Sequence, residues 1–246
     1  MKIIKLAITA LLAAVAVMSF ADTSPTPSDP QLDALKQLVE QRLGHDVKVD
    51  SITKTNFLGL YEVNLGGEII YTDEHAKYLV FGHVIDADTH EDYTKSSLEH
   101  INKIKFSDLP LESSIKMVHG NGKRVIAVFE DPNCGYCKRL RHTLASMDNV
   151  TVYTFLYNIL ADDSFVKSKN IWCTPDRLKA WDDWMLNGKA AAAAPASCKT
   201  TPNDQVLALG KKLHITGTPT IFFSDGSRAP GAMDGAALEE KWASLQ

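Results

Sequence analysis

A strongly apolar run that leads straight into a pair of cysteines constrains the fold of this chain more than any other feature. Residues 124–130 are apolar enough to form a strand buried on both faces, and residues 131–133 interrupt that run. Cys-Gly-Tyr-Cys follows at once at 134–137, then a helical segment at 138–147 and a second apolar strand at 150–157. Strand, helix and strand in this order form a βαβ unit, so the cysteines are expected at the end of a buried strand.

The remainder of the second half predicts a helical insertion followed by the last part of the sheet. Residues 162–213 are mostly helical in pattern, and Trp181 and Trp184 are expected in the core of this inserted subdomain. A strand at 220–223 and a final helix at 236–245 complete the half. These elements place the second half in the α/β class.

The first half predicts a smaller α+β domain. Leucine and valine at helical spacing predict a helix at 31–43, which Gly44 ends. Short apolar and β-branched runs at 58–63, 68–71 and 78–84 predict an antiparallel sheet. One helix and a few strands make a thin core, so we expect this domain to associate, with the last strand, extended to residue 85, pairing across a dimer. A charged helix at 93–104 then joins the two domains.

The first residues have the pattern of an export signal. Lys2 and Lys5 precede an apolar run at 6–18 and a small-residue cleavage motif at 19–21, so we predict cleavage after Ala21. The alternative is an uncleaved anchor, but the run is shorter than the roughly 20 residues that a spanning helix needs. Without the leader, 24 basic and 30 acidic side chains remain, and no basic block is present. Nucleic acid is therefore not an expected partner.

Four cysteines, all in the second half, imply disulfides in an exported chain. Four cysteines allow three pairings. Because Cys-x-x-Cys is a chemical unit by itself, we favour Cys134 with Cys137 and Cys173 with Cys198. The second pair would be a structural disulfide that raises the free energy of unfolding by roughly 3 kcal/mol. The alternative is that it acts as a second redox relay.

We assign Cys134 as the nucleophile and Cys137 as the resolving thiol. Exchange requires a thiolate that reaches a disulfide sulfur, so the attacking cysteine should be exposed and electrostatically activated. Cys134 is expected at the first turn of the helix at 138–147, where free amides and the macrodipole stabilise negative charge. Cys137 lies one turn deeper on the same face.

Other interpretations of the pair are a haem site, a zinc site and an inert disulfide. Lys138 stands where a c-type haem signature requires histidine. Zinc would need Cys173 and Cys198 as further ligands, but these do not form a second Cys-x-x-Cys knuckle. An inert disulfide across so short a loop would stabilise little. We therefore expect the pair to carry out thiol–disulfide exchange, with no metal and no cofactor.

Two acids before the cysteine pair and a Thr-Pro step late in the chain are further candidates for the active site. Glu130 and Asp131 could relay protons to Cys137, although acids at a strand end are more often solvated. The Thr218-Pro219 step precedes a strand, which is an allowed place for proline, and an ordinary turn proline is the alternative to a cis bond.

These segments in this order resemble the thioredoxin superfamily and, within it, the periplasmic disulfide isomerases of the DsbC family. The resemblance rests on residues 129–138, 171–173, 194–198 and 216–220. It implies a thioredoxin fold with a helical insertion, preceded by a small cystatin-like dimerisation domain and a linker helix. The implied domains are a signal peptide at 1–21, a dimerisation domain at 22–90, a linker at 91–110 and a catalytic domain at 111–246 with its insertion at about 160–213.

The resemblance also implies partners and a substrate site. A V-shaped homodimer would hold misfolded or misoxidised exported proteins in a cleft, with chaperone-like binding, and a membrane donor of the DsbD type would keep Cys134 reduced. Gly135, Tyr136, Thr218 and a cis Pro219 would line the substrate groove. The related DsbG proteins carry Pro-Tyr between their cysteines where this chain has Gly135 and Tyr136, which favours DsbC.

The sequence is compatible with three functions. The first is a protein-disulfide isomerase, the second a DsbG-like reductase of oxidised single cysteines, and the third a non-enzymatic holding chaperone with an apolar cleft. A net oxidase is a further enzymatic option, against which dimerisation argues. Loss of function on replacement of Cys134 would separate the enzymes from the chaperone.

Overall fold

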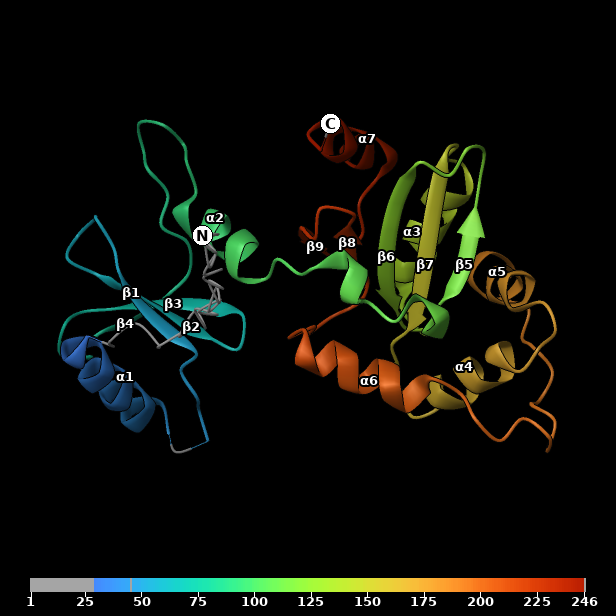
Figure 1. Cartoon of the computed structure of the whole chain (residues 1–246), viewed down its shortest axis with the longest axis horizontal. Coiled ribbons are helices and arrows are strands. Elements are labelled where there is room, and N and C mark those ends of the chain that lie inside the picture. Colours follow the sequence, from blue (N-terminus) through green and yellow to red (C-terminus); the bar gives the residue numbers. More distant parts are fainter. Residues whose placement is uncertain (1–28, 45, 246) are drawn as a thin grey trace, which may run out of the picture.

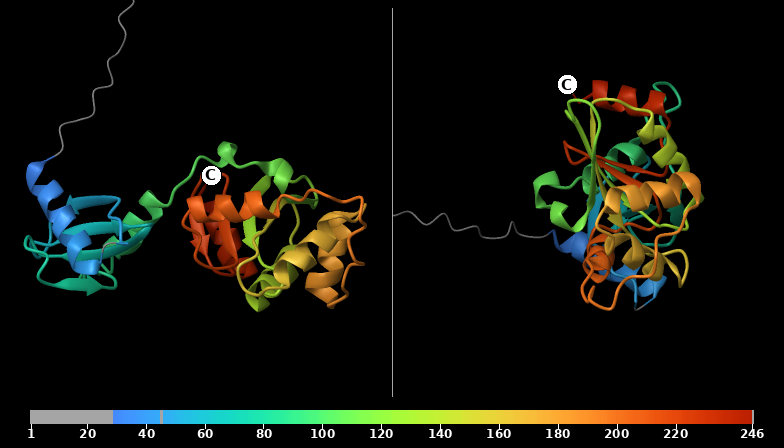
Figure 2. Two further views of the ribbon diagram at one scale, coloured as in Figure 1. Left: turned by 90° about the horizontal axis from the view of Figure 1, so that it is seen from below. Right: turned by 90° about the vertical axis from the view of Figure 1, so that its right-hand side faces the viewer.

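A computed structural model describes residues 29–44 and 46–245, and it consists of two lobes joined by a linker (Figures 1 and 2). The predicted signal peptide lies outside the described residues. In the first lobe one helix packs on a four-stranded antiparallel sheet of order β1-β2-β3-β4. Its elements are α1 (Pro30–Leu43), β1 (Ser51–Lys54), β2 (Tyr61–Leu65), β3 (Glu68–Thr72) and β4 (Leu79–Phe81).

Helix α1 ends at the predicted stop, Gly44, and Asp29 caps its start. The Asp29 side chain accepts the Gln31 N–H at 2.9 Å, and Gly44 ends the helix with a φ of +115°. Leu35 and Val39 are buried against the sheet. The sequence did not predict β1, because three of its four residues are exposed and show no apolar alternation.

The linker begins with α2 (Tyr93–Ile101), which Asp92 caps by accepting the Lys95 N–H at 2.9 Å. The helix ends at Ile101, three residues before the predicted 104, and Asn102 is its C-cap. Two 3₁₀ turns, Phe106–Asp108 and Leu111–Ser113, then lead into the second lobe.

The second lobe is built on a five-stranded sheet of order β5-β7-β6-β8-β9. Its strands are β5 (Ile115–Val118), β6 (Arg124–Glu130), β7 (Val150–Leu156), β8 (Thr220–Phe223) and β9 (Arg228–Pro230). Strands β6 and β7 are parallel and joined by α3 (Gly135–Ala145), which confirms the βαβ unit. The other pairs are antiparallel, and the two short edge strands β5 and β9 were not predicted.

Helices cover both faces of this sheet. Alternate residues of β6 face opposite sides, so Ile126 and Val128 pack with α3 and α7 (Gly235–Ala243) while Ala127 and Phe129 pack with α6. Three helices lie between β7 and β8, as the predicted insertion requires: α4 (Ser164–Trp172), α5 (Arg177–Asn187) and α6 (Asn203–Lys212).

Parts of the insertion differ from the prediction. The alanine run at 190–194 lies in the irregular segment between α5 and α6. Trp181 is fully buried as expected, but Trp184 is only half-buried, because its indole reaches out to the segment before the cysteines. Among the described residues, no helix combines the length and apolar character needed to cross a membrane.

Candidate active site

The cysteine pair lies where β6 ends and α3 begins. Helix α3 starts at Gly135, three residues earlier than predicted, because Cys134 itself is the N-cap. The Cys134 Sγ accepts the Cys137 N–H at 3.2 Å. A sulfur in this position lies by the free amides of the first turn, at the positive end of the helix dipole.

The segment before β8 covers the same sulfur from the other side. Strand β8 pairs antiparallel with β6, with Thr220 opposite Phe129, and this register brings Thr218 and Pro219 to the end of β6. The Thr218-Pro219 peptide bond is cis. In its thiol form Cys134 donates to the Thr218 carbonyl oxygen at 3.2 Å.

The expectation that Cys134 is well exposed is wrong. Only 3% of Cys134 is accessible, because the Thr218 backbone lies over its sulfur and the core of the insertion packs beside it. The exposed part of the motif is Gly135 and Tyr136, with Tyr136 61% exposed. A substrate disulfide would therefore approach over these two residues and Gly217, which is also exposed.

Cys137 is the deeper of the two cysteines. It is fully buried with Leu156 and Trp181. Burial raises the pKa of the Cys137 thiol, and the nearby Glu130 carboxylate raises it further. Cys137 is therefore held as a neutral thiol, which suits a resolving role better than an attacking one.

Asp131 is buried and not solvated as a strand-end acid usually is. Its carboxylate accepts four hydrogen bonds at 2.8 to 3.0 Å, from the backbone N–H groups of Asn133, Ile159 and Leu160 and from the Ser164 hydroxyl. These bonds tie the turn before Cys134 to the segment after β7. The arrangement is that of a structural anchor.

Glu130 is also fully buried but has a different environment. The Thr154 hydroxyl donates to its Oε2 at 3.2 Å, and its Oε1 has no partner among the described residues. Burial raises the pKa of Glu130 from 4.5 to about 7, against the opposing charge of Arg141. A carboxyl group that changes protonation near neutral pH beside Cys137 is suited to proton transfer.

Arg141 and Asp182 form a partly buried ion pair that was not predicted. Arg141 is 1% exposed, and its Nε donates to Asp182 on α5 at 2.6 Å, with Nη2 forming an ion pair to the same carboxylate. The spacing along α3 could have indicated that Arg141 is buried, because it lies four residues after Cys137 on the helix face that also carries Leu140 and Leu144. A charged residue within a buried stripe indicates a buried ion pair.

Trp184 and Asn133 hold the turn that carries the pair. The Trp184 indole donates to the Pro132 carbonyl at 2.6 Å. The Asn133 amide donates to Asp163 and to Ser164, both at 2.8 Å. The insertion thus fixes the backbone immediately before Cys134.

The other two cysteines form a disulfide between the end of α4 and the segment before α6. Cys173 and Cys198 are joined, with their Cα atoms 6.0 Å apart. Cys134 and Cys137 are both free thiols in the structure. In the part of the chain that the structure describes, no three His, Cys, Asp or Glu side chains are grouped to hold a metal ion.

Two family models match the chain. Residues 111–245 match a thioredoxin-like domain, and residues 10–95 match the N-terminal domain of disulfide bond isomerase proteins. Together these matches cover both lobes.

Named relatives match most of the chain. The chain is 47% identical to a probable thiol:disulfide interchange protein DsbC of Bordetella avium, over 90% of this chain and 78% of the relative. It is 29% identical to the thiol:disulfide interchange protein DsbC of Escherichia coli K12, over 85% of this chain and 86% of the relative. Among solved structures, a disulfide interchange protein from Neisseria gonorrhoeae aligns with 39% identity and a TM-score of 0.51, covering 55% of this chain and 97% of that chain.

Proposed function

The chain belongs to the DsbC family of thiol:disulfide interchange proteins, and from this premise we propose that it is a periplasmic disulfide isomerase and reductase that acts through Cys134. One observation carries the proposal. The Cys134 sulfur caps α3 by accepting the Cys137 N–H and lies 3.2 Å from the carbonyl oxygen before a cis proline. This sulfur lies at the positive end of the helix dipole, and beside it is a backbone surface on which an extended substrate can lie.

The exchange chemistry follows from the positions of the two sulfurs. The Cys134 thiolate attacks one sulfur of a substrate disulfide, a bond forms between them, and the second substrate sulfur leaves as a thiolate. In isomerisation another substrate thiolate attacks the mixed disulfide and releases Cys134 reduced, with no net redox change. In reduction Cys137 displaces the substrate, and the oxidised pair then needs two electrons from a donor, for which we propose a membrane protein of the DsbD type.

Glu130 is the proposed proton acceptor for Cys137. Cys137 must lose its proton before it can attack, and it is buried without contact to solvent. Glu130 is close enough to affect its pKa and itself titrates near neutral pH. Asp131 is proposed as an anchor and not as a second relay, because its oxygens already accept four hydrogen bonds.

We propose that Gly135, Tyr136, Thr218 and Pro219 line the substrate groove. The first two are exposed beside the sulfur, whereas Thr218 is half-buried and Pro219 buried. The exposed Tyr136 ring, with the Arg139 guanidinium 5.1 Å from its centre, offers an apolar face to unfolded segments. Chaperone-like binding of exported proteins is part of the same proposal, and so is export through residues 1–21.

We propose a homodimer formed through the edge strand β4. Among the described strands, β4 pairs only with β3, along one of its sides, and its exposed side chains include Val80 at 46% and Phe81 at 69%. An open edge with apolar side chains is a surface for pairing with a second copy.

The Phe81→Glu variant is expected to be monomeric at micromolar concentration. A charged side chain at the strand edge would be buried without a partner if two copies paired there, which costs several kcal/mol. Sedimentation equilibrium of the mature wild type and the variant measures this, with Lys54→Glu on the opposite edge strand β1 as a control that should stay dimeric. A monomeric wild type would refute the dimer.

The proposed activity is tested by refolding a scrambled multi-disulfide protein in a glutathione buffer. The mature protein is expected to accelerate recovery of native activity, because a thiolate at Cys134 reopens wrong disulfides. If it reduces accessible disulfides but does not speed recovery, the chain is a reductase. If it only suppresses aggregation, and does so equally with both thiols blocked, the chain is a holding chaperone and the proposal fails.

A further inference from the structure

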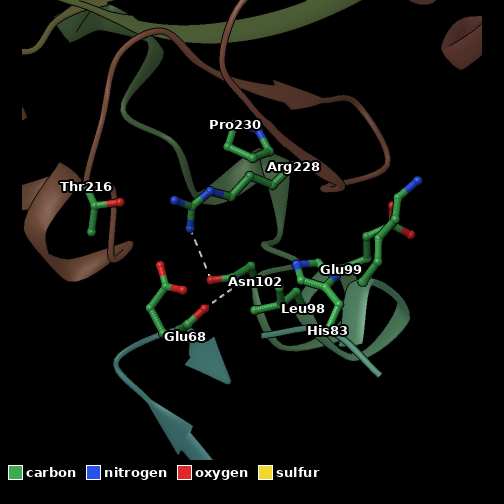
Figure 3. Close-up of a pocket in the computed structure, with 10 residues that line it drawn as sticks. Glu68, His83, Leu98, Glu99, Asn102, Thr216, Arg228 and Pro230 are labelled. Atoms are coloured by element: carbon green, nitrogen blue, oxygen red, sulfur yellow. Dashed lines mark hydrogen bonds between the residues drawn. The ribbon is translucent and has the colours of Figure 1, made fainter. Parts of the chain in front are cut away.

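A pocket lies between the two lobes, where the β2–β3 turn, α2 and β9 meet (Figure 3). It is lined from the first lobe by Gly67 and Glu68, from the linker helix by Leu98, and from the second lobe by Thr216 and Arg228. The cysteine chemistry does not use this pocket. Its polar groups nevertheless connect the first lobe with the segment that leads to the cis proline.

Asn102 bonds to both lobes with the two ends of one amide. Its Nδ2 donates to the Gly67 carbonyl at 3.0 Å, and its Oδ1 accepts from Arg228 Nη1 at 3.1 Å. Figure 3 shows the Asn102 side chain between β3 and Arg228. Asn102 is the residue at which α2 ends, so its position is fixed by the helix.

Arg228 continues the connection toward the active site. Its Nη1 also donates to the Leu213 carbonyl at 3.3 Å, and its Nη2 donates to the His214 carbonyl at 3.0 Å. These carbonyls begin the segment that ends at the cis Pro219. The planar guanidinium holds such acceptors in a fixed geometry that a lysine cannot reproduce.

The backbones of the two lobes also approach closely here. Gly67 has a φ of +85°, and a Cβ on it would lie 2.7 Å from Asn102 Oδ1 and 3.2 Å from the His214 Cβ. The Ile104 N–H donates to the Gly226 carbonyl at 3.0 Å, and a Cβ on Gly226 would lie 1.8 Å from the Ile104 oxygen. Glycine is needed at position 67 for the two lobes to approach, and at position 226 for the linker to lie against the second lobe.

We propose that Asn102 and Arg228 form an interdomain clamp that fixes the redox domain against the N-terminal domain and so positions the cis-proline loop for isomerisation of protein substrates. The inference rests on the proposed function. Both residues are positioning residues, since neither touches the reacting sulfurs. Isomerisation needs the substrate held in place while the mixed disulfide persists, whereas reduction of an accessible disulfide needs only Cys134 and Cys137.

The Asn102→Leu variant tests the clamp because it removes both hydrogen bonds at similar volume. Its isomerisation rate is expected to fall about five- to ten-fold while reduction of a small accessible disulfide changes less than about twofold. Hydrogen exchange is expected to rise at residues 62–72, 100–106 and 211–219. Lys95→Met, which replaces another residue lining the same pocket, is the matched control and should leave both readouts unchanged.

Asn102→Asp separates the two halves of the clamp. A carboxylate keeps the acceptor for Arg228 and loses the donor to Gly67, so exchange should rise at 62–72 but not at 211–219. Unchanged exchange in Asn102→Leu, or an equal loss of isomerisation and reduction, would overturn the clamp. Failure of the proposed function is a different result, because it shows as absent isomerisation by the wild type before any substitution is made.

Discussion

The Cys134→Ala variant is expected to lose isomerisation and reduction together, each falling at least about 10³-fold. The reason is that Cys137 cannot replace the missing nucleophile. Cys137 is fully buried, and burial and the Glu130 charge both raise the pKa of its thiol. Recovery of a scrambled multi-disulfide protein and reduction of a small disulfide by the mature variant measure the two rates.

The matched control for this variant is His142→Ala. His142 is exposed later in the same helix α3 and lies outside the proposed substrate groove, so its replacement should leave both rates near those of the wild type. Suppression of aggregation is expected to survive in Cys134→Ala, because the exposed Tyr136 remains. Residual exchange above about a tenth of the wild-type rate would assign the attack to another thiol and refute the proposed role of Cys134.

The Glu130→Gln variant is expected to be more stable than the wild type above neutral pH, by up to about 3 kcal/mol. Burial raises the pKa of Glu130 from 4.5 to about 7, so between these values the folded state binds a proton that the unfolded state has released. The stability that the neutral carboxyl contributes is complete below pH 4.5 and is lost as pH rises through 7. Glutamine keeps the neutral form at every pH.

Denaturant unfolding between pH 4 and 8 measures this difference. The free energy of unfolding should fall with pH more steeply in the wild type than in Glu130→Gln, and the two curves should separate mainly between pH 4.5 and 7. Glu112→Gln, which changes an exposed acid, should keep the wild-type slope. Parallel curves for wild type and Glu130→Gln would show that Glu130 is ionised across this range. The same variant should also slow the Cys137 step if Glu130 accepts its proton.

The sequence predicts those elements that have their own apolar signal. The bounds of β6 and β8 agree with the predicted 124–130 and 220–223, because these strands are buried on both faces. The strands that were not predicted, β1, β5 and β9, lie at sheet edges and are three or four residues long. An edge strand owes its structure to a neighbour, so its own residues carry little pattern.

The start of α3 is another feature that the local sequence pattern does not predict. Helical periodicity begins at Lys138, but the helix begins at Gly135 because the Cys134 sulfur accepts a backbone N–H as a cap. Cysteine is not among the usual capping residues, so composition did not indicate it. The helix start therefore depends on the same contact that prepares the sulfur for chemistry.

The redox chemistry could be predicted from local residue types, because the cysteine pair, its place between strand and helix and the order of elements around it all follow from them. The surroundings of the two sulfurs depend instead on contacts between segments that are far apart in the sequence. The pairing of β6 with β8 brings the Thr218 carbonyl to Cys134 across 84 residues of sequence, and α5 brings Asp182 to Arg141. Burial of Glu130 and of Cys134 depends on these long-range contacts, because the local sequence encodes a residue's chemistry and the packing of distant segments sets its exposure and charge environment.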